Sequence, residues 1–188
     1  MEPVATPTPE PAAKAEPAKR FPSRWKPGPN GWIVLFDGRS LDGWIGVDDH
    51  WQVRDSELRG VGSNGVAFLN AREADWTDYT LSLKLLLGKS GDAVISHGVL
   101  AAHLGERQVR LGYPQQGWRT LDQKDKGLAR LKWYDVAFTV RGKHAEVRIN
   151  DQVALATDAH EPLAGAPALE ALEGGVAFRD IRVRLIES

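Results

Sequence analysis

Five side chains in the middle of the sequence have types that suit sugar binding: His97, Gln108, Arg110, Tyr113 and Trp118. An aromatic ring stacks on the apolar face of a pyranose, while nearby polar side chains bond to its hydroxyls. We expect His97, Gln108 and Arg110 to project from neighbouring strands, with Trp118 in the loop that follows. Strand alternation groups Tyr113 with the opposite face. The plainer alternative is a solvated sheet face on which Trp118 anchors a loop.

Carboxylates matter because cleavage of a glycosidic bond needs two of them, one on each side of the bond. Most Asp residues of this chain stand in turns, where Asp caps its own backbone. Asp92 is the remaining catalytic candidate, since it opens a predicted strand. We find no second carboxylate at a fitting place on the same face, and we therefore lean toward a domain without catalysis.

Other catalytic and metal sites find little support in the sequence. The chain has no cysteine, and its five histidines are scattered without close carboxylates. We therefore predict no metal and no cofactor. The glycine-rich stretch 60–65 precedes a predicted strand instead of a helix, so it is expected to be a turn and not a phosphate loop.

Composition places the chain among ordinary globular proteins. It has 188 residues, 42% hydrophobic and 26% charged, and a net charge of −1. This charge gives no attraction to nucleic acid, so no nucleic-acid partner is expected. No apolar stretch is long enough for a transmembrane segment, and no signal peptide is recognisable. The compartment cannot be deduced.

Residues 1–30 differ in composition from the rest and hold eight of the eleven prolines. Proline fixes φ and removes a backbone donor, which favours an extended arm. A basic and aromatic cluster lies near its end, and we predict that it docks on a protein partner: Arg20, Phe21, Arg24, Trp25 and Lys26. A solvated linker is the alternative.

Residues 31–188 alternate between short apolar strands and turns. Strands are expected at 33–36, 51–54, 57–60, 66–70, 79–87, 93–100, 108–113, 134–140, 145–149, 152–157 and 176–186, with a bulge at Arg179-Asp180. Residues 114–131 form a long polar connection. About ten short strands with regular turns and almost no helical periodicity predict an all-β domain. We expect a two-sheet antiparallel β-sandwich of the jelly-roll type.

Three segments carry a family resemblance: GWIVLFDGRSLDGW, KWYDVAFTVRGKHAEVRINDQVAL and GGVAFRDIRVRLIE. Their order and spacing resemble the 3-keto-disaccharide hydrolase-like domain of the concanavalin-A-like lectin/glucanase group. The resemblance implies the concanavalin-like sandwich and an ancestral hydrolase activity on 3-keto-disaccharides. In the family an acidic and polar strand is typical where this chain has Arg107-Gln108-Val109-Arg110-Leu111-Gly112-Tyr113, so its carboxylates are replaced.

Three functions follow as expectations. The first is a non-catalytic lectin-like module, or an accessory subunit of a larger assembly, with the N-terminal arm on a partner. The second, implied by the resemblance, is a hydrolase of 3-keto-disaccharides. The third is a carbohydrate-binding domain that acts alone.

Overall fold

Every regular element in the described part of the chain is a β-strand. The computed structural model describes residues 26–46, 49–71, 76–114 and 117–187, with only the backbone for 63–71. The strands are β1 (Ile33–Val34), β2 (Trp44–Ile45), β3 (Trp51–Arg54), β4 (Glu57–Ala71), β5 (Tyr79–Leu87), β6 (Asp92–His97), β7 (Leu100–Leu104), β8 (Val109–Tyr113), β9 (Arg119–Lys124), β10 (Trp133–Arg141), β11 (His144–Ile149), β12 (Gln152–Asp158) and β13 (Pro167–Leu185). The all-β prediction is confirmed.

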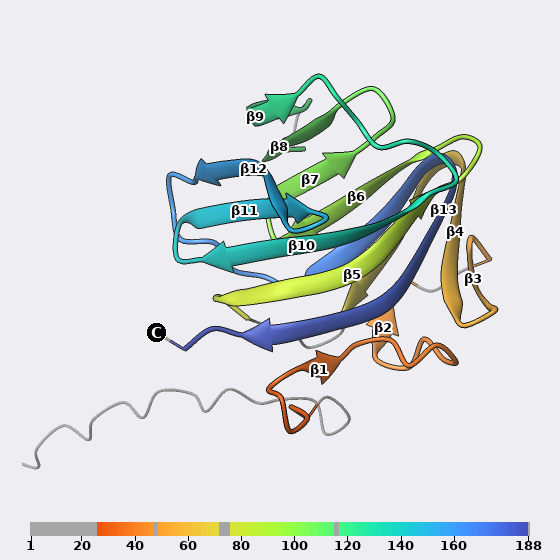
Figure 1. Cartoon of the computed structure of the whole chain (residues 1–188), viewed down its shortest axis with the longest axis horizontal. Coiled ribbons are helices and arrows are strands. Elements are labelled where there is room, and N and C mark those ends of the chain that lie inside the picture. The colour runs from red at the N-terminus through yellow and green to blue at the C-terminus, as the bar shows by residue number, and fades with distance from the viewer. Residues whose placement is uncertain (1–25, 47–48, 72–75, 115–116, 188) are drawn as a thin grey trace, which may run out of the picture.

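The strands pair antiparallel in the order β12-β11-β10-β5-β13-β6-β7-β8-β9, with β4 alongside β13. β13 belongs to both layers of the sandwich, because residues 167–172 pair with β6 and residues 176–185 pair with β5. Figure 1 shows β4 and β13 curving together along the edge of the molecule. The two ends of the order meet where β12 contacts β8 and β9. The jelly-roll expectation is therefore confirmed.

Alternation along β5 shows how the core forms. Leu81, Leu83, Leu85 and Leu87 are all buried, while the residues between them are half-buried. In an extended strand successive side chains point to opposite faces, so these leucines line one side. They pack with Phe138 of β10 and Phe178 of β13, both fully buried. Burial of these apolar surfaces is the main force that holds the two layers together.

Several local predictions are confirmed. Asp55 and Ser56 join β3 to β4 with φ of 54° and 60°, as the predicted tight hairpin requires. The predicted bulge appears as a register shift between Arg179 and Arg182, with Asp180 at φ 55°. Asn150 and Asp151 form the left-handed turn between β11 and β12.

Four strand predictions need correction. The turn expected at 60–65, between strands at 57–60 and 66–70, is not formed, because residues 57–71 make the single strand β4, which pairs with β13 along its length with one register shift. The single strand expected at 93–100 is the β6–β7 hairpin, because Gly98 at φ 56° turns the chain back. The connection expected at 114–131 contains β9, which pairs with β8. β13 starts at Pro167, earlier than expected, because residues 167–172 pair with both β4 and β6.

The N-terminal arm lies mostly outside the described residues, and so do Arg20, Phe21, Arg24 and Trp25 of the predicted docking cluster. Lys26 begins the described chain and is exposed. Within the described residues, no helix is long and apolar enough to cross a bilayer.

Candidate functional site

Strand register gathers polar side chains on the outer face of β13, β6, β7 and β8. Glu170 pairs with Val94, Val94 with His103, and His103 with Arg110. Directly paired residues point to the same side of a sheet. Their neighbours along the strands, such as Leu169 and Leu104, belong to the core cluster. Glu170, His103 and Arg110 therefore share the face that points away from the core.

Trp118 packs on this face from the connection between β8 and β9. The guanidinium carbon of Arg110 lies 4.4 Å from the Trp118 ring centroid, which is a cation–π contact. The His103 ring meets Trp118 edge-on at 5.9 Å. Gly112 makes room for the indole, since a Cβ there would lie 2.9 Å from Trp118 Nε1. We call Glu170, His103, Arg110 and Trp118 the Trp118 face.

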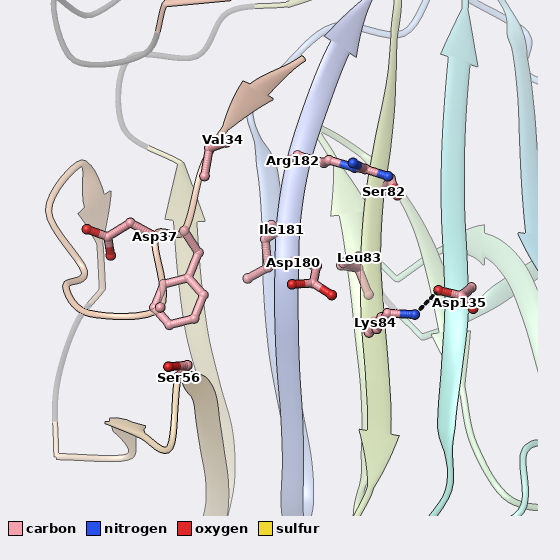
Figure 2. A pocket seen from close by; sticks show the side chains of 12 residues that line it. Val34, Asp37, Ser56, Ser82, Leu83, Lys84, Asp135, Asp180, Ile181 and Arg182 are labelled. Atoms are coloured by element: carbon pink, nitrogen blue, oxygen red, sulfur yellow. Dashed lines mark hydrogen bonds and ion pairs between the residues drawn. The ribbon is translucent and has the colours of Figure 1, made fainter. Parts of the chain in front are cut away.

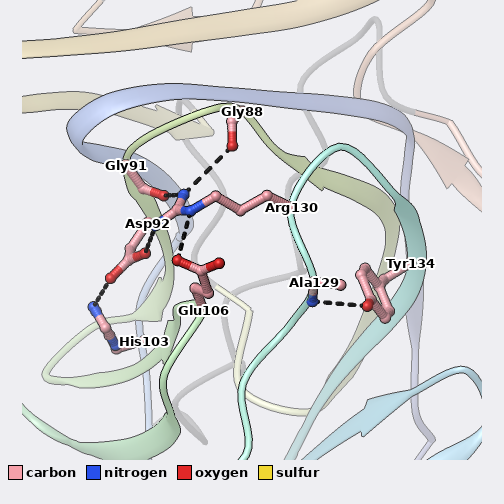
Figure 3. Close-up of polar contacts among 8 residues, drawn as sticks. All are labelled: Gly88, Gly91, Asp92, His103, Glu106, Ala129, Arg130 and Tyr134. Carbon is pink, nitrogen blue, oxygen red and sulfur yellow. Dashed lines mark hydrogen bonds and ion pairs between the residues drawn. The ribbon is translucent and has the colours of Figure 1, made fainter.

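Asp92 lies at the edge of the Trp118 face, where its carboxylate contacts His103 and Arg130 (Figure 3). Its Oδ2 lies 3.2 Å from His103 Nε2, and its Oδ1 lies 3.6 Å from Arg130 Nη2. Arg130 is itself fixed, because it donates to Glu106 at 2.9 Å and to the Gly91 carbonyl at 2.7 Å. The hydrogen bond from His103 and the nearby charges hold the pKa of Asp92 below its ordinary value. Asp92 is therefore an ionised, well-positioned carboxylate.

Glu170 has the opposite electrostatic environment. It is half-buried on β13, and burial raises the pKa of its carboxyl group above the ordinary value. In the register Asp92 pairs with Leu172 and Glu170 pairs with Val94, so the two carboxyl groups are diagonal neighbours on adjacent strands. Two acidic groups with pKa values displaced in opposite directions thus occupy one face.

Three buried polar atoms on the Trp118 face have no hydrogen-bond partner among the described residues. They are His103 Nδ1, Arg110 Nε and Trp118 Nε1. Buried polar groups are nearly always paired, so each exception needs an explanation. In the neutral form of His103, Nε2 faces the acceptor Asp92 and carries the proton, which leaves a lone pair on Nδ1. The other two atoms carry N–H groups, so the cluster presents one acceptor and two donors.

The structure places His97 and Tyr113 on the core side of their strands, apart from this cluster. His97 has no exposed surface; its Nδ1 lies 2.8 Å from the Tyr79 hydroxyl, on the core side of β6. Tyr113 packs against the core cluster, as strand alternation predicts. Gln108 is half-buried, and its backbone carbonyl accepts a hydrogen bond from Gly105 N at 3.1 Å.

Two members of the Trp118 face, His103 and Glu170, were not predicted from the sequence as site residues. The β6–β7 turn at Gly98 is the signal that would have located His103, because that turn pairs it with Val94. For metal binding, the described residues contain no cluster of three or more His, Asp or Glu side chains.

Comparisons with solved structures define the fold. A putative glycosyl hydrolase from Parabacteroides distasonis ATCC 8503 matches with a TM-score of 0.66 at 12% identity, covering 84% of this chain and 95% of that one. The carbohydrate binding module CBM66 from Bacillus subtilis matches with a TM-score of 0.66 at 14% identity, covering 76% and 95%. The β-glucanase of Bacillus licheniformis matches with a TM-score of 0.64 at 9% identity, covering 83% and 97%. The fold is thus the concanavalin-like sandwich.

Sequence comparison gives the family. Residues 31–184 match the model of the 3-keto-alpha-glucoside-1,2-lyase-like domain, and the chain belongs to this family. The resemblance stated from the three motifs is thereby confirmed. No curated protein matches the chain.

Proposed function

We propose that this chain is a carbohydrate-binding domain and that the Trp118 face is its site. One observation carries the proposal: three buried polar atoms without described partners lie together beside an aromatic ring. A hydroxyl group donates one hydrogen bond and accepts two. It therefore complements the lone pair of His103 and the N–H groups of Arg110 and Trp118, which are covered in this structure and become accessible to a sugar once the Trp118 ring moves aside. A sugar supplies hydroxyls beside an apolar face that suits the indole.

The fold supports the same proposal, because sandwiches of this class include a carbohydrate binding module and a galectin. Within the proposal, the domain is a non-catalytic module or accessory subunit. Residues 1–30 bind a protein partner through Arg20, Phe21, Arg24, Trp25 and Lys26. The support for this arm is its alternation of cationic and aromatic residues, which suits an acidic surface with apolar pockets.

A glycan array followed by calorimetry tests the sugar site. We expect saturable binding of at least one glycan, with affinity lowered about tenfold or more by Trp118→Ala and by Arg110→Ala. Trp133→Ala and Arg179→Ala are matched controls, because these two residues form a similar stack, at 4.2 Å, between β10 and β13. Binding that survives Trp118→Ala unchanged would overturn the proposed site.

Deleting residues 1–30 tests the arm separately. We expect the deletion to remove a co-purified protein partner without changing the thermal midpoint of the sandwich. A partner that stays bound to the shortened chain would refute the arm proposal and leave the sugar site untouched.

A second candidate function is cleavage of 3-keto-glycosides, favoured by the family match and by the pair of unlike carboxyl groups on one face. Asp92 orients His103, whose Nδ1 takes the proton from C2 of the sugar, which the 3-keto group acidifies. The C2–H electron pair forms the C1–C2 double bond as the C1–O bond breaks. Glu170 in its protonated form gives its proton to the departing oxygen.

Release of the departing alcohol from a 3-keto-disaccharide, followed by NMR, tests this candidate. Turnover should fall by at least about a hundredfold in Asp92→Ala and in Glu170→Gln if both groups act. Glycan binding without any turnover would reject the catalytic candidate and keep the binding domain.

A further inference from the structure

A hollow lies on the other layer of the sandwich, away from the Trp118 face. It has a volume of about 450 Å³ and is bordered by β1, β5, β10 and the C-terminal half of β13. This volume falls in the lower part of the range for small-molecule sites. We call it the Asp180 pocket, because Asp180 stands in its middle between Ile181 and the ion pair of Lys84 with Asp135 (Figure 2).

The β13 bulge builds this pocket. Register shifts between Arg179 and Arg182 leave Asp180 out of the ladder, with φ of 55°. The carbonyl of Ile181 accepts hydrogen bonds from Leu35 N at 2.9 Å and from Phe36 N at 3.2 Å, so the bulge is tied to the loop after β1. Bulges redirect a side chain and are frequent beside functional sites. This bulge redirects the Asp180 carboxylate into the pocket.

The loop after β1 is held just as firmly. Asp37 Oδ1 accepts from Arg39 N at 2.8 Å and from Ser40 N at 2.9 Å, which fixes the Asp-Gly turn. Gly38 at φ 79° packs on the β3–β4 turn, where its Cβ would lie 3.2 Å from Ser56 Cβ. The pocket walls are therefore positioned by the backbone before any ligand arrives.

Charge and hydrogen-bonding capacity select the ligand. The side chains of Asp180, Ser56 and Ser82 form no hydrogen bond or ion pair with other described residues, so their hydrogen-bonding capacity is available to a ligand. Asp135 is paired with Lys84, and Arg182 stacks over Trp32 at 4.5 Å. The acidic residues disfavour an anion, while Lys84 and Arg182 disfavour a cation. A neutral ligand that both donates and accepts suits this mixture.

We propose that the Asp180 pocket binds one neutral monosaccharide unit. Asp180 accepts hydrogen bonds from two adjacent hydroxyls, Ser82 and Lys84 donate to ring or hydroxyl oxygens, and Val34 covers an apolar edge. A carboxylate with two oxygens bonds well to a pair of neighbouring hydroxyls. This site is independent of the Trp118 face, so the domain would contact a glycan at two places on opposite layers.

Titration of the full chain with methyl glycosides of glucose, mannose and galactose, each added separately, tests the proposal by amide NMR. We expect at least one of them to shift the amides of Ile181, Arg182 and Ser82 in a saturable way. Asp180→Asn should weaken this response about tenfold or more, because the amide has one accepting oxygen in place of the two charged oxygens of the carboxylate. Asn tolerates positive φ, so the bulge itself is retained.

Two controls separate this site from others. Asp151→Asn makes the same change at another exposed residue of positive φ, 64°, and should leave the response unchanged. Trp118→Ala should remove any response of the Trp118 face and keep that of the pocket, so the two proposals fail separately. The pocket proposal is overturned if none of the three glycosides shifts these amides, or if Asp180→Asn responds like the wild type.

Discussion

The carboxylate of Asp92 lies 3.2 Å from the imidazole of His103 and connects the start of β6 to β7. Gly105 leaves room for this contact, because a Cβ there would lie 2.6 Å from Asp92 Oδ2 and 3.0 Å from His103 Cε1. Arg130 supports the same carboxylate from the loop before β10. The contact leaves Nδ1 of His103 as the acceptor of the Trp118 face. Its strength can be tested by measuring the free energy of unfolding.

Asp92→Asn should lower the free energy of unfolding at neutral pH by roughly 1–2 kcal/mol, because it removes a charge-assisted hydrogen bond. The folded state lowers the pKa of Asp92 from its ordinary 3.8. Its stabilising contribution is therefore present above this value and is lost as the pH falls through the folded pKa. Urea unfolding from pH 7 down to acid should show the two proteins converging. An equal difference at every pH would contradict the assignment.

Glu170→Gln should raise the free energy of unfolding at neutral pH, whereas Asp92→Asn should lower it. Burial raises the pKa of Glu170, so the folded state prefers the protonated form. The carboxyl group favours folding most below its unfolded pKa, and this advantage is lost as the pH rises through the folded value. Glutamine avoids the burial of a charge, so the variant should be more stable than the wild type at pH 7. Thermal unfolding at pH 4 and pH 7 should show the gain only at the higher pH.

Gly112→Ala should disrupt the Trp118 face. A Cβ at this position would lie 2.2 Å from the Arg119 carbonyl and 2.9 Å from Trp118 Nε1, so β9 or the indole must move. We expect a loss of about 1–3 kcal/mol and a change in Trp fluorescence. Gly175→Ala is the control, since its Cβ would meet no atom within 4 Å. Equal effects of the two substitutions would show that the packing of Trp118 on Gly112 is unimportant.

Tyr79→Phe should destabilise the fold while sparing ligand binding. It removes the 2.8 Å hydrogen bond between the Tyr79 hydroxyl and His97 Nδ1, and both side chains are fully buried. Losing one partner of a buried hydrogen-bonded pair lowers the free energy of unfolding by about 1–3 kcal/mol. Each kcal/mol corresponds to a fall of about 2–4 °C in Tm for a domain of this size. Glycan affinity should stay constant, because this pair lies on the core side of β6. A large loss of glycan affinity in a variant that still folds would indicate that His97 takes part in binding.

The sequence alone supports the scaffold. Leucines at every second position from Leu81 to Leu87 predict β5 with its inner face, and the structure buries all four. Turn residues such as Asp55-Ser56 and Asn150-Asp151 predict hairpins, because few residues accept positive φ. These signals are local: each is set by a few neighbouring residues, whatever the rest of the chain does.

The candidate site depends on strand pairing and register between distant segments, which local sequence patterns do not specify. β6 and β7 are buried on both faces, so hydropathy along 92–104 does not tell His97 from His103. Gly98 turns the chain and sets the register that places His103 beside Arg110 and sends His97 into the core. Glu170 joins them only because β13 extends to Pro167 and pairs with β6.

The amino-acid sequence by itself determined that the domain is an all-strand sandwich, since alternation and turn chemistry act over short distances. Only the tertiary structure decided which polar groups share a face, because a shift of one residue in register sends every side chain of a strand to the opposite side.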